Sequence, residues 1–221
     1  MGVPQGAPIL LYLHSVREIY KYCYDMLLYE ERAGARMSME RYPEHRKRDL
    51  LLSDLIAQNS VKSVIENIFD INEDDRQKEG IYKDWERTPI RLYINSYGGS
   101  VYDGLALIDV IKRSKTPVHT ICIGSCMSMG LWIWLAGSKR LVGEYATLMF
   151  HDISAYAVDK TEGIKQELKE MLRIQEMLIA DITENSLVTE ETLRDYILRK
   201  AEWFIPADEA LSLKLANGYY K

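Results

Sequence analysis

Hydrophobic positions alternate between two periods from residue 49 onward. Short apolar runs predict buried strands at residues 50–52, 90–95, 118–123, 140–142 and 147–150. Apolar residues spaced three to four apart predict helices at residues 59–67, 101–113, 125–136 and 161–183, with shorter helices after Thr189 and over residues 206–215. Repeated strand–turn–helix units of this length predict an α/β domain with a largely parallel sheet.

Two stretches depart from this alternation. Residues 70–86 are polar and include the acidic run Glu73-Asp74-Asp75, which we interpret as a solvated connector. Residues 1–48 are rich in tyrosine and mixed charge, with a helical period over residues 15–32. We interpret them as a divergent arm for packing or assembly, the alternative being a segment that contacts substrate or a partner. The expected domains are therefore the arm, 1–48, and an α/β domain, 49–221.

Composition narrows the classes of function. The 221 residues are 47% hydrophobic, which is enough for one compact domain with a full core plus an extension. The net charge of −5 argues against binding to nucleic acid or to an anionic membrane. The apolar runs are too short to span a bilayer, and the first residues lack the basic start of a signal peptide. We therefore expect a cytoplasmic protein.

The cysteines indicate neither disulfides nor a metal site. Cys23, Cys122 and Cys126 are odd in number, and two of them lie in the apolar middle of the chain, so we expect all three to be reduced. Cys122 and Cys126 are four residues apart and no second Cys or His pair accompanies them, which argues against zinc. No metal and no cofactor are expected.

Three short motifs supply the groups needed for serine acyl transfer. A double glycine, Gly98-Gly99, follows one predicted strand, Ser128 follows another, and His151 ends a third. They offer, in turn, bare backbone amides, a hydroxyl nucleophile and an imidazole base. Each motif alone has an ordinary structural explanation, as a tight turn, a helix cap and a packed histidine. The surroundings of Ser128 also differ from the G-x-S-x-G pattern, because Cys126 stands at the first glycine.

Four segments in this order resemble the proteolytic subunit family of Clp protease. They are residues 94–101 (INSYGGSV), 126–130 (CMSMG), 148–151 (LMFH) and 203–210 (WFIPADEA). Tyr97 stands where the family usually has proline, and the family's nucleophile segment usually reads Ala-Ala-Ser-Met-Gly. The resemblance covers about residue 49 to the end of the chain.

The resemblance implies the spiral α/β fold shared by Clp proteolytic subunits and crotonases, with a protruding handle helix after His151. It implies a serine peptidase in which Ser128 is the nucleophile, His151 the base, and the amides of Gly99 and Met129 the oxyanion donors. It also implies a homo-oligomer of two stacked seven-membered rings around a closed chamber. Polypeptides would be the substrates, fed by a ring ATPase of the AAA+ unfoldase class.

Departures from the family pattern concern the acid, the site mouth and the arm. Glu202 occupies the position of the family's triad aspartate, and we prefer it to the alternative, Asp195, which falls in a predicted helix. Asp152 replaces the glutamine that usually follows the histidine. Residues 1–48 do not resemble the short start that forms the family's axial loops. This difference argues against docking to a Clp-type ATPase.

The leading hypothesis is a self-compartmentalised serine endopeptidase that forms an acyl-enzyme on Ser128. One alternative is a catalytically silent ring subunit, which the substituted acid keeps open. A second is a phage-type protease that matures capsid or scaffold proteins without an ATPase, suggested by the arm. A third is a crotonase-type acyl-CoA enzyme, a class that has no need for a paired serine and histidine.

Overall fold

A mostly parallel β-sheet organises the computed structural model, which describes residues 47–154 and 159–221. The strands are β1 (Asp49–Leu52), β2 (Ile90–Ser96), β3 (Val118–Met127), β4 (Lys139–Val142), β5 (Thr147–Phe150), β6 (Trp203–Pro206) and β7 (Gly218–Tyr219). One path through the sheet has the order β1-β2-β3-β4-β7, while β5 pairs with β3 in parallel and with β6 in antiparallel fashion. The predicted α/β class is confirmed. The expected helix over residues 15–32 lies outside the described residues.

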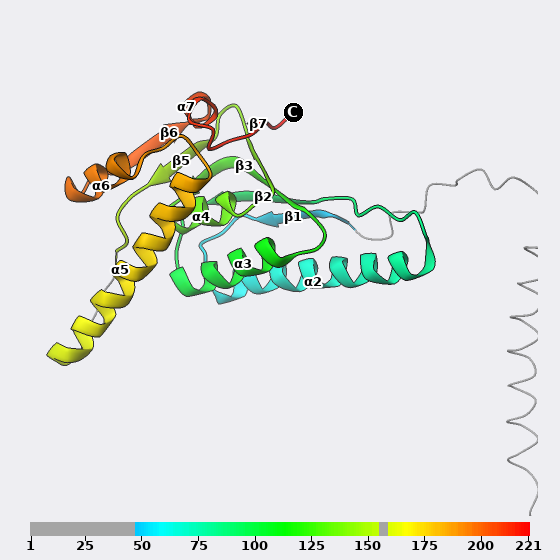
Figure 1. Cartoon of the computed structure of the whole chain (residues 1–221), viewed down its shortest axis with the longest axis horizontal. Helices are drawn as coiled ribbons and strands as arrows, with labels where there is room; N and C mark the ends of the chain where they lie inside the picture. Colours follow the sequence, from blue (N-terminus) through cyan, green and yellow to red (C-terminus); the bar gives the residue numbers. More distant parts are fainter. Residues whose placement is uncertain (1–46, 155–158) are drawn as a thin grey trace, which may run out of the picture. The chain divides into compact units, whose positions relative to one another are not determined.

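Helices separate most of the strands and cover the sheet. They are α2 (Gln58–Ile81), α3 (Val101–Arg113), α4 (Met129–Leu135), α5 (Thr161–Glu184), α6 (Glu190–Leu198) and α7 (Ala207–Ser212). Helices α2 and α3 pack side by side along one face of the sheet, and the N-terminal turns of α5 extend away from the body (Figure 1). The predicted helix over residues 101–113 is confirmed, and Thr189 caps α6 as expected, accepting the Thr192 N–H at 3.2 Å.

Strand β3 changes its partner halfway along its ten residues. Its first part, from His119 to Cys122, pairs with β4, whereas Ser125 to Met127 pairs with β5. The pairing with β5 carries the strand as far as Met127, so the helix expected from residue 125 begins only at Met129. Helix α4 is buried at all seven positions, which gives it no amphipathic pattern by which to locate its start.

Helix α2 is far longer than expected and replaces most of the predicted solvated connector. It runs for 24 residues and carries the acidic run in its fifth turn. Its buried positions keep a helical spacing and are Val61, Val64, Ile68, Ile71 and Asp75. The prediction of a loop was wrong because a charged residue, Asp75, occupies the last of these core positions.

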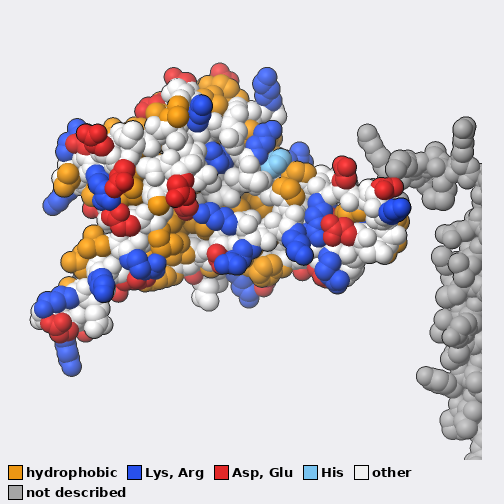
Figure 2. All heavy atoms as spheres, viewed as in Figure 1, with side chains coloured by type: hydrophobic (Ala, Val, Ile, Leu, Met, Phe, Trp, Pro, Cys, Tyr) orange, Lys and Arg blue, Asp and Glu red, His pale blue; other side chains and the backbone are white. Residues whose placement is uncertain are grey.

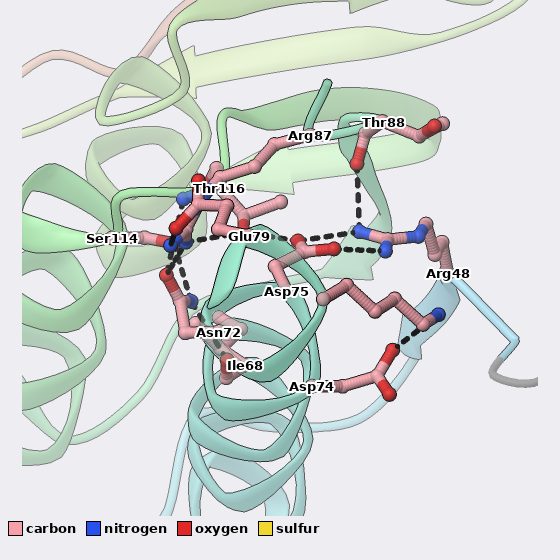
Figure 3. Close-up of polar contacts among 11 residues, drawn as sticks. Arg48, Ile68, Asn72, Asp74, Asp75, Glu79, Arg87, Thr88, Ser114 and Thr116 are labelled. Atoms are coloured by element: carbon pink, nitrogen blue, oxygen red, sulfur yellow. Dashed lines mark hydrogen bonds and ion pairs between the residues drawn. The ribbon is translucent and has the colours of Figure 1, made fainter. Parts of the chain in front are cut away.

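Asp75 belongs to a buried polar cluster formed with Arg48, Thr88 and Thr116 (Figure 3). Its carboxylate accepts two hydrogen bonds from the Arg48 guanidinium, at 2.9 and 2.5 Å, and one from the Thr116 hydroxyl at 2.6 Å. Arg48 also donates to the Thr88 carbonyl at 2.8 Å. Burial alone would raise the pKa of Asp75, but the bonds from Arg48 and Thr116 lower it below its ordinary value.

Hydrophobic side chains gather where α5 leaves the body (Figure 2). On this helix Ile164, Leu168 and Leu172 are each between 43% and 59% exposed, although they continue the apolar stripe that packs Ile174 and Leu178 in the core. A row of exposed apolar side chains of this kind marks a surface for association. Within residues 47–154 and 159–221, no helix has the length and apolar character needed to cross a bilayer.

Candidate active site

Ser128 lies in a strained turn between β3 and α4. Its backbone has φ 52° and ψ −123°, a left-handed conformation that costs a non-glycine residue about 1–3 kcal/mol. Hydrogen bonds on both sides hold it there, since its N–H donates to the Met149 carbonyl at 2.9 Å and its carbonyl accepts from Leu131 at 3.0 Å. A sharp strand-to-helix turn of this type also presents the serine in the G-x-S-x-G hydrolases. The strand-to-helix turn of those hydrolases is therefore present here, although the chain lacks their G-x-S-x-G sequence pattern.

His151 follows β5, the parallel neighbour of β3. Because Met127 pairs with Met149, both strands end at the same edge of the sheet and their next residues emerge together. The Nε2 atom of His151 lies 2.8 Å from the Ser128 hydroxyl oxygen, and both side chains are half-buried. At this distance the imidazole can take the hydroxyl proton, which is the contact that a nucleophile and its general base require.

The Gly98-Gly99 turn presses against Ser128. Both glycines have positive φ, 104° and 145°, and a Cβ on Gly98 would lie 2.7 Å from the Cβ of Ser128. A Cβ on Gly99 would collide with the backbone of Ile56. Ile56 binds the turn on both sides of Gly99, donating to the Gly98 carbonyl at 2.8 Å and accepting from the Ser100 N–H at 2.7 Å. Glycine at both positions is what allows this approach.

A cavity of about 60 Å³ adjoins the reactive pair. It is lined by Gly99, Val101, Ser128, Met129, Leu131, Trp132, Phe150, His151, Ile153, Ser154 and Leu178. Gly99 and Met129, the two residues expected to supply oxyanion amides, thus border the same cavity as Ser128 and His151. The cavity thus adjoins each residue that the sequence assigned to the reaction except Glu202.

The two candidate acids lie in different surroundings. Phe150 pairs with Trp203 in the antiparallel β5–β6 ladder, and one further step in this register sets Glu202 opposite His151. Glu202 is exposed, and among the described residues no hydrogen bond joins its carboxylate to the imidazole. Asp195 is instead ion-paired with Arg199 on the outer surface of α6. The register of β5 and β6 therefore favours Glu202 over Asp195 as the neighbour of His151.

Two contacts near the site were not predicted. The Gln175 amide on α5 donates to the Asp152 carboxylate at 2.9 Å, which ties the residue after His151 to the protruding helix. The indole N–H of Trp132 on α4 donates to Asp181 of α5 at 2.6 Å. The only sequence signal for the first contact is that Gln175 interrupts an apolar stripe.

Cys126, two residues before Ser128, is not a competing nucleophile. Its side chain is fully buried, and burial, reinforced by the neighbouring Cys122 thiol, raises the pKa of the Cys126 thiol well above its ordinary value. Cys122 and Cys126 are both free cysteines. In the described part of the chain, no group of three or more His, Cys, Asp or Glu side chains is arranged to hold a metal ion.

Comparison with known proteins identifies relatives of this chain. The sequence model of the Clp protease family matches residues 39–218. The ATP-dependent Clp protease proteolytic subunit 2 of Prochlorococcus marinus (strain MIT 9312) is 35% identical over 164 residues, which cover 71% of this chain and 76% of the relative. Subunit 1 of the same strain is 27% identical over 184 residues, covering 80% and 89% of the two chains. Subunit 2 of Synechococcus sp. (strain CC9605) is 30% identical, covering 71% and 78%.

Proposed function

The chain belongs to the Clp protease family, a family of peptidases, and from this premise we propose that it is a serine endopeptidase working through an acyl-enzyme on Ser128. The observation that carries the proposal is the 2.8 Å contact between His151 Nε2 and the Ser128 hydroxyl beside a cavity. A serine that only capped a helix would not require a strained backbone conformation.

The reaction proceeds in two halves. In the first, Ser128 Oγ attacks the peptide carbonyl carbon while His151 Nε2 takes its proton. The tetrahedral oxyanion accepts hydrogen bonds from the amides of Gly99 and Met129, donors worth about 2.7–4 kcal/mol each in serine hydrolases. The intermediate collapses, and the amine leaves with the proton from the imidazolium. In the second half, water attacks the ester, His151 takes a proton from that water and returns it to Ser128.

We assign the third role, orienting the imidazole, to Glu202. Its register position opposite His151 supports this, as does the ion pair that engages Asp195 elsewhere. A glutamate has one more methylene than the family's aspartate, so its carboxylate reaches farther from the chain just before β6. Closing on the His151 ring would fix the tautomer that leaves Nε2 free to accept a proton.

We also propose that the protein acts as a homo-oligomer built into a ring chamber. The exposed apolar row on α5 supports assembly, because an isolated chain would leave that row in water. The relatives are named proteolytic subunits of ATP-dependent Clp proteases. We propose the ring without assigning an ATPase partner to this chain. Hydrolysis by Ser128 and His151 needs no nucleotide, so short peptides are expected to be cleaved without ATP.

A catalytically silent ring subunit is the second candidate. The observation in its favour is that no hydrogen bond connects Glu202 with His151 in the part of the chain that the structure describes. In that case Ser128 and His151 would still be in contact, but no carboxylate would fix the tautomer of the His151 imidazole. The Ser128 hydroxyl would then react slowly.

Intact-mass spectrometry after incubation with a fluorophosphonate separates the two candidates. The expected result is a single adduct on the wild-type chain that Ser128→Ala abolishes. His151→Ala should slow the labelling strongly, while Cys126→Ala should leave it intact because that thiol is buried. An oligomeric wild-type sample that forms no adduct would favour the silent subunit.

A further inference from the structure

We propose that Ser96 is a positioning residue for the oxyanion site. Its hydroxyl holds the Gly98-Gly99 turn in the conformation that leaves the Gly99 N–H available to a developing oxyanion. This inference rests on the proposed serine peptidase function and adds a residue to it that does not line the cavity beside Ser128. Ser96 is the last residue of β2, and its side chain is only 2% exposed.

The hydrogen bonds of the turn leave one N–H group free. The Ser96 hydroxyl accepts the N–H of Gly98 at 3.2 Å. The N–H of Ser100 donates to the Ile56 carbonyl at 2.7 Å, and the Gly98 carbonyl accepts from Ile56 at 2.8 Å. Between these bonds, the Gly99 N–H donates to no acceptor within residues 47–154 and 159–221. Because Gly99 also borders the cavity, its N–H is the donor of this turn that an oxyanion can use.

The Gly98 N–H requires the Ser96 hydroxyl because Gly98 is buried. A buried N–H without a partner costs about as much free energy as a lost hydrogen bond. If the hydroxyl is removed, the peptide group before Gly98 gains by rotating toward another acceptor or toward water. That rotation also moves the next peptide group, which carries the Gly99 N–H. The two glycines do little to resist it, since they lack the side chains that restrict backbone dihedral angles.

Ser96 also packs against the segment that supplies the second expected oxyanion donor. A Cβ on Gly130 would lie 3.3 Å from the Ser96 Cβ and 3.1 Å from the Ser96 carbonyl oxygen, so the first turn of α4 rests on Ser96. Met129, whose amide is that second donor, directly precedes Gly130. The β2–β3 ladder shifts its register just before Ser96 and pairs it with Cys126. One residue thus contacts both segments that carry the oxyanion amides.

The test compares an oxoester of a short peptide with its thionoester, in which sulfur replaces the carbonyl oxygen of the cleaved bond. Both substrates need the nucleophile and the base, but sulfur is a weak hydrogen-bond acceptor and gains little from oxyanion donors. Ser96→Ala should lower kcat and kcat/KM for the oxoester by about 10²-fold, the loss that a misplacement of about 1 Å produces. The thionoester should be cleaved at nearly the wild-type rate, so the oxoester-to-thionoester ratio narrows.

Ser125→Ala is the matched control on the neighbouring strand. Ser125 is also buried, at 7% exposure, but its hydroxyl bonds to the Asn95 side chain at 3.1 Å instead of the glycine turn. This variant should keep the wild-type oxoester-to-thionoester ratio. A purely structural loss at either serine would lower the rates of both substrates together and leave their ratio unchanged.

Ser96→Cys separates the hydrogen bond from packing. Under reducing conditions the thiol fills nearly the same space as the hydroxyl, but it is a weak acceptor. The ratio for Ser96→Cys should therefore fall between those of the wild type and Ser96→Ala. If Ser96 served packing alone, Ser96→Cys would have the wild-type ratio.

Two results would overturn the inference, and they are distinguishable. A full-length wild-type chain that reacts with a fluorophosphonate, together with a folded Ser96→Ala variant of wild-type ratio, would refute the role of Ser96 and leave the proposed function intact. If Ser96→Ala does not fold, a wild-type ratio in Ser96→Cys would refute it in the same way. A wild-type chain that is folded by circular dichroism but neither reacts with the fluorophosphonate nor cleaves the oxoester would refute the proposed function and this inference with it.

Discussion

The sheet carries two contrasting polar regions at its opposite ends. Ser128 and His151 follow strands, whereas Arg48, Thr88 and Thr116 precede strands of the same parallel sheet. The cluster around Asp75 is buried and its charged groups each make several hydrogen bonds. The reactive pair is half-exposed, one of its members is strained, and its one described side-chain hydrogen bond joins the two members to each other. The polar groups of the Asp75 cluster, which stabilise the fold, are thus satisfied by hydrogen bonds within the protein. The Ser128–His151 pair retains donors and acceptors that a substrate can use.

The largest expected effect is on the reactive pair. Ser128→Ala and His151→Ala should each lower kcat for a short peptide by about 10⁴- to 10⁶-fold, the range found when a serine nucleophile or its base is removed. The measurement is release of a fluorescent amine in the absence of ATP. The double variant should be no slower than either single one, because the two side chains act as a unit. A His151→Ala variant with wild-type kcat would exclude the imidazole as the base.

The Asp75 cluster should respond in stability instead. Asp75→Asn leaves Arg48 buried without its counter-ion, and should lower the free energy of unfolding by about 3–5 kcal/mol. Replacing both partners, Arg48→Met with Asp75→Leu, should cost less than that. The matched control is Asp109→Asn at the exposed Asp109–Arg113 pair, where the expected loss is about 0–1 kcal/mol. Equal losses at Asp75 and Asp109 in urea unfolding would contradict the contrast between buried and exposed pairs.

The pH dependence of stability follows from the lowered pKa of Asp75. An acid whose pKa is lower in the folded state stabilises the protein above its unfolded pKa, about 3.9 for aspartate. That contribution is lost as the pH falls through the folded value. The wild-type chain should therefore lose stability below about pH 4 more steeply than the Arg48→Met/Asp75→Leu variant. If the free energy of unfolding, measured in urea, falls equally steeply with decreasing pH in both proteins, the Arg48–Asp75 pair is not linked to protonation.

The contrast also explains what could be predicted from the sequence. The sequence predicts the alternation of strands and helices, and it places Gly99, Ser128 and His151 at strand ends. Both are predictable because a few neighbouring residues determine where a strand ends and a turn begins. The length of α2 could not be predicted, because the charged residue Asp75 occupies a buried position of the helix. Its partner, Arg48, lies 27 residues away in the sequence. The hydrogen bond from Trp132 to Asp181 could not be predicted either, because its partners lie 49 residues apart on different helices.

A smaller effect is expected from the acid of the site. Glu202→Gln should lower kcat about 10²-fold or more, since it leaves the imidazole tautomer without a carboxylate to fix it. Asp195→Asn, at an exposed ion pair on α6, should leave kcat within twofold of the wild type. The comparison uses the same peptide assay, with the unfolding midpoint of each variant measured alongside. A large loss for Asp195→Asn and none for Glu202→Gln would reverse our assignment.

The smallest effect concerns the strain at Ser128, and it separates stability from function at one residue. Ser128→Ala removes the hydroxyl but keeps a Cβ in the left-handed conformation, whereas Ser128→Gly removes the Cβ as well. Both variants should be inactive, yet Ser128→Gly should be about 1 kcal/mol more stable than Ser128→Ala, even though glycine elsewhere loses more conformational entropy on folding. Urea unfolding of the two variants measures the difference directly. A Ser128→Gly variant less stable than Ser128→Ala would mean that the turn is not strained.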